Sequence, residues 1–184
     1  MACDFIPVGQ GATACTENYA GTGTTAYVFK TEDVDTTALK VDEKTNTYTG
    51  FKLKDGKKIT PIALKNQANK VASTSLGFCN GFKNVATVVI ERDLDLAAVL
   101  SRAVNNANFG VLLPKAGIGQ GAYILWNPMT RTEVEISDDT GDAYDSDNQA
   151  TWTITSAPMA YPRMGISDTE FKALTINTGA SSDA

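Results

Sequence analysis

Histidine is absent from all 184 residues of the sequence. This side chain is the one most used for general acid–base catalysis, for activating nucleophiles and for binding transition metals near neutral pH. Carboxylate dyads and Ser–Lys pairs remain open, but among 21 acidic residues some pairs arise by chance, and no spacing distinguishes one. We therefore predict that the protein is not an enzyme and has no catalytic residue.

Cysteine is scarce as well. Cys3, Cys15 and Cys79 are odd in number and lack the spacing of metal ligands, and isolated free cysteines are common in cytoplasmic chains. These features argue against a disulfide scaffold and against a cysteine-based metal centre. We expect no cofactor.

Long apolar runs are also missing. No stretch approaches the roughly 20 apolar residues that span a bilayer. The opening Met1-Ala2-Cys3-Asp4 lacks the charged and apolar regions of a signal peptide. We therefore expect no membrane partner, and synthesis in the cytoplasm.

The residues that are abundant favour strands. Thr, Val, Ala and Gly are frequent, and short apolar runs are separated by Gly, Asn and Asp. The runs that we interpret as strands cover residues 26–29, 48–53, 59–64, 84–91, 109–113, 122–126, 133–136 and 151–155, with 70–76 as a further candidate. The fold class predicted from them is mainly β (α+β), an antiparallel β-barrel or sandwich of six to eight strands with one flanking α-helix.

One segment has helical periodicity. An aspartate cap at Asp93 precedes apolar residues spaced three and four apart. These residues are Leu96, Val99, Leu100, Ala103 and Val104. The pattern predicts a helix over 93–104 whose apolar stripe covers a sheet or a barrel opening.

No repeat or second domain is detectable. Residues 1–25 contain four glycines and little periodicity, which predicts an extended N-terminal arm. Residues 26–176 form a single β-rich domain in this interpretation, and residues 177–184 have the composition of a flexible C-terminal tail.

The clearest local signal is a predicted β-hairpin. Segments 48–53 and 59–64 flank Asp55-Gly56, a dipeptide that suits the positive φ angles of tight hairpin turns. Four lysines surround the turn, namely Lys52, Lys54, Lys57 and Lys58. Lysine is typical of solvated or edge positions in a sheet.

Charge is unevenly distributed along the chain. Residues 40–70 contain eight lysines against three acidic residues and have a net charge of +5, whereas residues 133–149 contain seven acidic residues, no lysine and no arginine. Both stretches are consistent with solvated loops that serve solubility. The sharper hypothesis is that a basic hairpin and an acidic loop at opposite ends of one subunit steer head-to-tail stacking of identical copies.

The acidic loop has a second interpretation. Its carboxylates belong to Asp138, Asp139, Asp142, Asp145 and Asp147. Hard cations prefer several carboxylate oxygens, so calcium binding stays open, although the spacing does not match an EF-hand loop.

In the order of these elements the chain resembles the small tail-tube proteins of long-tailed phages, prophages and tailocins. The resemblance covers residues 26–155: a strand, the Asp55-Gly56 hairpin, a β-helix-β unit, the hairpin over 117–126 and a final strand pair. The opening Ala2-Cys3-Asp4 with Cys15, and the run 123–126 followed by a turn and the strand 151–155, also look like members of that group.

The resemblance implies a virion structural protein. Six copies would join their sheets into a ring, and rings would stack head to tail into a hollow conduit for DNA. The partners implied are the chain itself, other virion tail proteins, and double-stranded DNA as non-specific cargo, with assembly in the host bacterial cytoplasm. In this interpretation the 52–58 hairpin contacts the adjoining ring, the arm lies on a neighbour, and acidic side chains line the bore, where they repel phosphates.

Three other functions remain open from the sequence. The first is another phage structural protein, such as a decoration, head-completion or tail-terminator subunit. The second is a carbohydrate or peptide binding module that uses Trp126, Trp152, Tyr123 and Tyr161 as a stacking platform. The third is a nucleic-acid binder that uses the lysines of residues 40–70, against which the overall net charge of −5 argues.

Overall fold

The computed structural model describes residues 22–66, 68–78, 80–91, 102–104, 106–117, 119–139 and 149–176. Strands make up 53% of it, so the protein is mainly β. The strands are β1 (Thr25–Lys30), β2 (Val34–Asp35), β3 (Lys40–Asp42), β4 (Thr47–Thr49), β5 (Lys52–Leu53), β6 (Thr60–Ala63), β7 (Lys70–Ser75), β8 (Phe82–Glu91), β9 (Phe109–Pro114), β10 (Ala122–Leu125), β11 (Glu133–Asp139), β12 (Gln149–Met159) and β13 (Gly165–Ile166). A 3-10 turn, η1 (Thr31–Asp33), and a short helix, α2 (Asp168–Ala173), complete the described elements.

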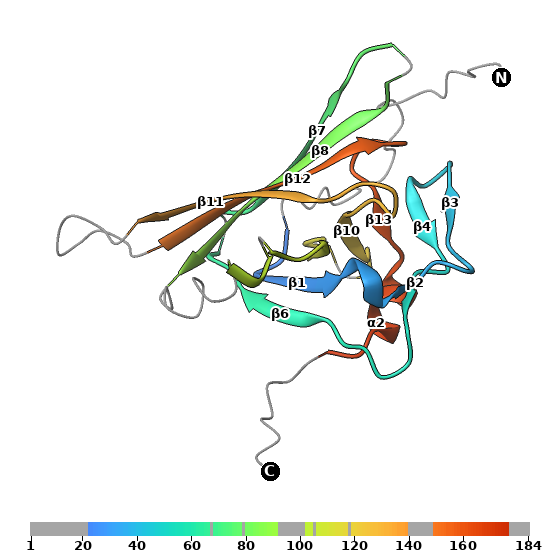
Figure 1. Cartoon of the computed structure of the whole chain (residues 1–184), viewed down its shortest axis with the longest axis horizontal. Helices are drawn as coiled ribbons and strands as arrows, with labels where there is room; N and C mark the ends of the chain where they lie inside the picture. Colours follow the sequence, from blue (N-terminus) through green and yellow to red (C-terminus); the bar gives the residue numbers. More distant parts are fainter. Residues whose placement is uncertain are drawn as a thin grey trace, which may run out of the picture.

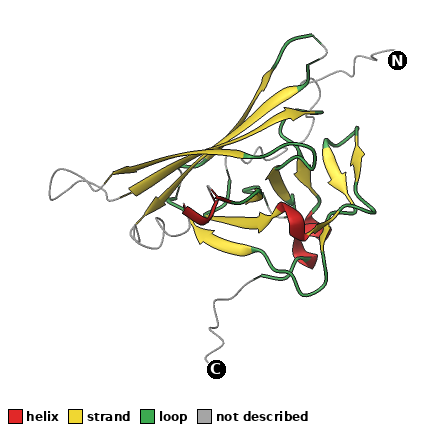
Figure 2. Ribbon diagram, in the orientation of Figure 1, coloured by secondary structure: helices red, strands yellow, loops and turns green. Residues whose placement is uncertain are grey.

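These strands form three sheets (Figures 1 and 2). The largest has the order β3-β4-β13-β10-β9-β1-β6, the second has the order β11-β12-β8-β7, and the third consists of β2 and β5. Neighbouring strands are antiparallel except β4 and β13, which are parallel. No sheet closes into a barrel within the described ranges, so the predicted barrel is not observed, and the thirteen strands exceed the six to eight predicted because several of them are only two or three residues long.

The seven-stranded sheet has apolar residues on both faces. Along β1, Ala26 belongs to one buried cluster and Phe29 to the other, and along β9 the same alternation separates Val111 from Leu112. Strand side chains point alternately to opposite faces, so a run that is apolar at every position fits only a sheet covered on both sides. This sheet is therefore the middle layer of the molecule.

One face of the middle layer packs on the four-stranded sheet. The side chains of Ala150, Trp152 and Ile154 from β12 enter this cluster with Val88 of β8 and Val111 of β9. In Figure 1 the four-stranded sheet crosses the body obliquely, and its strands extend past the seven-stranded sheet at both ends.

The other face is covered by the short elements around an aromatic cluster. The centroid of the Trp126 ring lies 5.9 Å from that of Phe29, 5.8 Å from that of Tyr48 and 5.9 Å from that of Phe51. These are edge-on arrangements, which aromatic pairs prefer. Gly110 makes room for them, since a Cβ atom there would lie 2.8 Å from Trp126 Cβ.

The predicted strands are largely confirmed. The pairings β7–β8, β9–β10 and β11–β12 are all present as antiparallel neighbours. Helix α2 begins after the N-cap residue Ser167. Of the helix predicted over 93–104, only residues 102–104 are described, and they are helical. The arm, apart from residues 22–25, and the tail lie outside the described residues.

The predicted Asp55-Gly56 hairpin is wrong as a pairing. A turn is present, with Lys57 N donating to Lys54 O at 3.1 Å, and among the turn residues only Gly56 has positive φ, at 75°. However, β5 pairs with β2 and β6 pairs with β1, so the turn connects two different sheets. The local turn signal was real, but tertiary packing chose other partners for its strands.

Helix α2 is attached to the β4–β5 connection by one carboxylate. Glu170 accepts hydrogen bonds from the backbone N–H groups of Gly50, at 2.5 Å, and of Phe51, at 3.3 Å. Its second oxygen accepts from the backbone N–H of Ser167 at 3.3 Å, and the Ser167 hydroxyl accepts from the backbone N–H of Glu170 at 3.3 Å, so the two residues form a capping box. A single side chain therefore caps the helix and satisfies two donors of a distant loop.

We expect Glu170→Ala to lower the free energy of unfolding by about 2 kcal/mol, because hydrogen bonds to a charged group are strong and the loop donors lose their acceptor. Chemical denaturation measures this difference. Thr169→Ala is the matched control, since Thr169 is exposed on the same helix. Equal stability of the two variants would contradict the role assigned to Glu170.

Candidate functional site

The basic segment predicted to contact another subunit lies beside α2, at the side of the molecule opposite the free ends of β11 and β12 (Figure 1). Three of its four lysines interact within the chain. Lys52 Nζ lies 3.0 Å from a carboxylate oxygen of Asp35, and Lys57 Nζ lies 3.0 Å from Asp33. Lys54 donates to the carbonyl oxygen of Glu32 at 2.6 Å. Much of this charge is therefore used to hold the segment to η1 and β2.

The carboxylate of Asp35 has several polar contacts, with Thr37 and with Lys52. Hydrogen bonds from the hydroxyl and the backbone N–H of Thr37, together with Lys52, hold the pKa of the Asp35 carboxyl well below its usual range. A carboxyl with a depressed pKa is charged throughout the neutral range. Lys58 is different, because it is exposed and has no ion pair or hydrogen bond with the described residues.

The lysines of residues 40–70 do not form one basic face. Lys40 lies on β3, at one edge of the seven-stranded sheet, whereas Lys70 begins β7, at an edge of the other large sheet. The nucleic-acid interpretation required a single continuous surface, which the fold does not provide in the described residues.

The acidic stretch is described only in part. Glu133, Asp138 and Asp139 belong to β11, while Asp142, Asp145 and Asp147 lie outside the described residues. No group of three potential metal ligands occurs in the part of the chain that the structure describes. The calcium interpretation stays untested.

The stacking platform proposed for a binding module is not on the surface. Trp126 is fully buried and Trp152 is 1% exposed, and they belong to separate clusters. Tyr123 and Tyr161 are half-buried. A ligand cannot stack on the two indole rings without unfolding the core.

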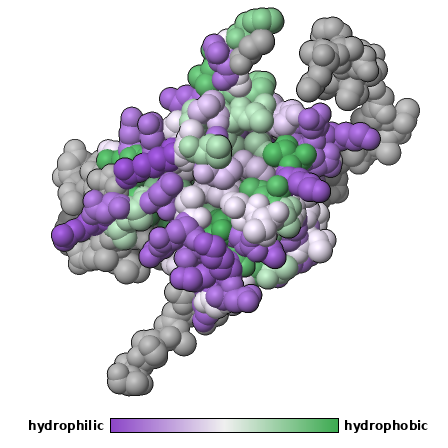
Figure 3. All heavy atoms as spheres, turned by 45° about the vertical axis from the view of Figure 1, so that its right-hand side comes forward, coloured by the Kyte–Doolittle hydropathy of each residue, from purple (hydrophilic) through white to green (hydrophobic). Residues whose placement is uncertain are grey.

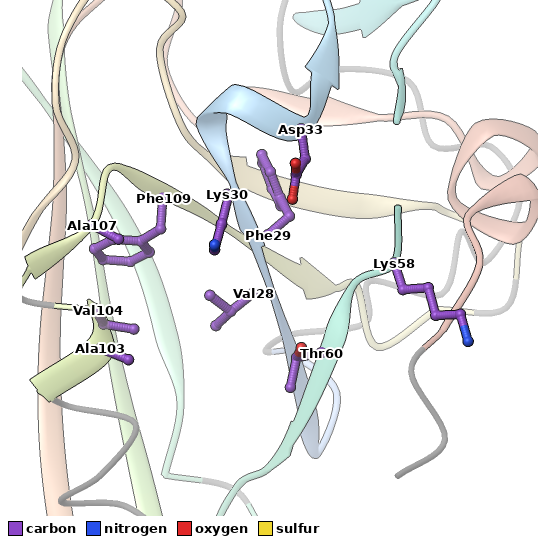
Figure 4. Close-up of a pocket in the computed structure, with 10 residues that line it drawn as sticks. All are labelled: Val28, Phe29, Lys30, Asp33, Lys58, Thr60, Ala103, Val104, Ala107 and Phe109. Carbon is purple, nitrogen blue, oxygen red and sulfur yellow. The ribbon is translucent and has the colours of Figure 1, made fainter. Parts of the chain in front are cut away.

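Cavities lined by the described residues have volumes of about 180 to 470 Å³. One of about 260 Å³ lies between β1, β6 and residues 103–109, with Val28, Val104 and Phe109 as apolar walls (Figure 4). Lys30 and Asp33 add charge at this cavity, but Asp33 is already paired with Lys57. Ala103 and Val104 of the helical residues 102–104 line this cavity. Residues 92–101, which come before them, are outside the described ranges, so the cavity supports no ligand assignment.

The feature that the sequence interpretation missed is the outer face of the four-stranded sheet. We use this name for the side that points away from the core cluster. It consists of Glu133, Glu135 and Ser137 of β11, Thr151, Thr153 and Thr155 of β12, Lys83, Val85, Thr87 and Val89 of β8, and Lys70, Ala72 and Thr74 of β7. The sequence does contain a signal for this face, because Thr alternates with buried residues over 150–155, as in a strand with one face on the core.

The residues of the outer face lie in ordered rows across the sheet. One row runs Glu135, Thr153, Thr87, Lys70, and the next runs Glu133, Thr155, Val85, Ala72. Acidic residues are therefore at the β11 side, lysine is at the β7 side, and threonine and valine lie between. The face is mostly polar, with charges of opposite sign at its two sides.

Both edges of this sheet lack a partner strand in the described part of the chain. β11 has seven residues and pairs only with β12, and β7 has six and pairs only with β8. Exposed edges of this length present a row of unpaired N–H and C=O groups, which pair readily with another chain.

The β7 edge is held in place by a buried network. Asn84 of β8 is 1% exposed, and its side-chain oxygen accepts from Ser73 of β7 and from the backbone N–H of Arg163 at 3.1 Å. Asn84 also donates to the carbonyl oxygen of Tyr161 at 3.3 Å. A buried polar network that is fully bonded fixes the geometry of the strands that carry it.

The turn between β7 and β8 exposes apolar side chains. Phe78 is 94% exposed and Leu76 is 41% exposed, and the turn itself is closed by a hydrogen bond from Leu76 N to Gly81 O at 2.9 Å. Figure 3 shows this end projecting from the rest of the surface, at the top of the view.

None of the helices within the described ranges has the length and hydropathy of a membrane-spanning segment. Comparison with known proteins adds no assignment: no family model, no curated protein and no solved structure matches the chain.

Proposed function

We propose that the chain is a self-assembling structural subunit of a phage-like tail tube. Copies join through the edges of the four-stranded sheet into a ring, and rings stack into a hollow conduit through which DNA passes. The chain performs no reaction in this proposal. The resemblance in element order suggested such a role, and the observation that now supports it is the four-stranded sheet.

This sheet has the properties that a ring wall needs. One face is packed on the core, the opposite face is mostly polar and is exposed along the edge strands β7 and β11, and both edges are free of partners in the described residues. Its strands also extend beyond the seven-stranded sheet (Figure 1). A sheet of this kind buries its unpaired edges when copies are placed side by side.

Strand direction is compatible with a closed ring. The four strands are antiparallel in succession, so β7 runs opposite to β11. Copies related by rotation about a central axis then continue the sheet without any parallel junction. Six copies would contribute roughly two dozen strands, more than the ~16–18 that leave an open aqueous channel in porins.

The outer face would line the bore. Threonine is the most frequent of the residues named for this face, with Glu133 and Glu135 on β11 and the two lysines Lys70 and Lys83 on β7 and β8. Clustered cationic side chains bind phosphates through counterion release, and this face has no such cluster in the described residues. DNA would therefore slide along it without being held.

The test is the assembly state of the untagged chain at high concentration. Light scattering gives the mass in solution, and negative-stain electron microscopy shows the shape. We expect rings or tubes with a constant bore. Closed rings that never extend would favour a tail-terminator subunit, and a chain that remains monomeric at every concentration would overturn the proposal.

A second prediction concerns stacking of the rings through the basic segment at 52–58. We expect Lys58→Glu to shorten tubes several-fold at low salt without changing the folded state, because this exposed lysine has no described partner within the chain and is available to an adjoining ring. Tube length is measured by electron microscopy and folding by circular dichroism.

Lys57→Glu provides the comparison. Lys57 pairs with Asp33, whose side chain is only 15% exposed, so this substitution places two carboxylates together. We expect it to lower the free energy of unfolding by about 1 kcal/mol. If the Lys58→Glu variant formed tubes of normal length at low salt, the 52–58 segment would have no part in the contact between stacked rings.

A further inference from the structure

The two edge strands of the four-stranded sheet carry opposite charge on the outer face. Glu133 and Glu135 are exposed on β11, which contains no basic residue. Lys70 is exposed on β7 and is the one charged residue of that strand. Since opposite charges on facing strands stabilise a sheet and like charges destabilise it, each edge favours one kind of partner.

The faces of the sheet restrict how two edges can meet. Val134 and Ile136 of β11 and Val71 of β7 pack against the core cluster, on the side opposite the charged residues. A shift of one residue would turn those apolar side chains toward solvent, so only shifts of two residues keep both faces intact. When β11 of one copy and β7 of the next overlap along most of their length, each of these registers places Glu133 or Glu135 directly opposite or diagonal to Lys70 of the next copy.

Other pairings of identical edges lack this attraction. Two β11 strands joined about a two-fold axis would bring four glutamates together across one junction. Two β7 strands would bring no carboxylate to either lysine. The charges therefore disfavour the isologous β11 junction and stabilise only the heterologous one, which is the junction that leads to a ring.

We propose that β11 of one copy pairs antiparallel with β7 of the next, and that Glu133 and Glu135 against Lys70 select this junction over pairing of like edges. The inference rests on the proposed function, because it specifies which edges join the copies of the ring. It makes these three residues determinants of assembly and leaves the fold of the single chain unaffected.

Charge exchange tests the junction. We expect Glu133→Lys with Glu135→Lys, and separately Lys70→Glu, to raise the concentration needed for ring formation by about tenfold or more at low salt, since both edges then carry the same sign. The variant that combines all three substitutions restores opposite charges and should assemble near the wild-type concentration. Ring formation is followed by sedimentation velocity and electron microscopy.

A mixing experiment provides an independent measurement. The Glu133→Lys/Glu135→Lys variant brings lysines against Lys70 at the junction, and the Lys70→Glu variant brings a glutamate against Glu133 and Glu135, so neither should form rings alone. An equal mixture should form rings in which the two variants alternate. This result cannot arise from a general loss of stability, because both components must be folded to assemble.

Lys83→Glu is the matched control. Lys83 is exposed on the same outer face, but it lies on the inner strand β8. We expect this variant to form rings at the wild-type concentration.

Two results would overturn the junction. One is unchanged assembly of the single-sign variants, and the other is a triple variant or an equal mixture that assembles no better than its parents. Wild-type dimers in which two β7 strands pair with each other would also overturn the junction. Failure of the wild-type chain to form any ring would instead count against the proposed function itself.

Discussion

The fold depends on burying both faces of the seven-stranded sheet. Strands β1, β9 and β10 have apolar side chains at successive positions, so neither face can remain in water. One face requires a second sheet, and the other requires the short strands, α2 and the aromatic cluster around Trp126. At about 25 cal/mol per Å² of apolar surface, this two-sided burial is the largest stabilising contribution available to the chain.

The four-stranded sheet has a different requirement. Only its inner face is needed to cover the middle layer, so its outer face is free to carry threonine, glutamate and lysine. Because β8 and β12 are ten and eleven residues long, they extend past the layer that they cover. Exposed edges and a polar face follow from this geometry, and they are the features on which the proposed assembly depends.

Sequence reasoning predicted the strands better than their partners. Apolar alternation correctly indicated the strands β7 to β12, and the structure pairs β7 with β8, β9 with β10 and β11 with β12, each with its neighbour along the chain. The strands on either side of Asp55-Gly56 were paired wrongly, because β5 joins β2 and β6 joins β1 in the tertiary structure. The two tryptophans were proposed as a surface platform, yet both are in the core. Trp152 lies at one of the alternating buried positions of β12, and Trp126 directly follows the buried end of β10.

The sequence by itself determined that the protein is mainly β, that its strands lie at apolar alternations, and that charge is concentrated in separate stretches. These properties are local, because side-chain period and turn chemistry act within a few residues. Tertiary structure alone decided which strands are edges, which face stays exposed, and that Glu133, Glu135 and Lys70 share one face. Such relations join residues distant in sequence, and only the packing of the complete core fixes them.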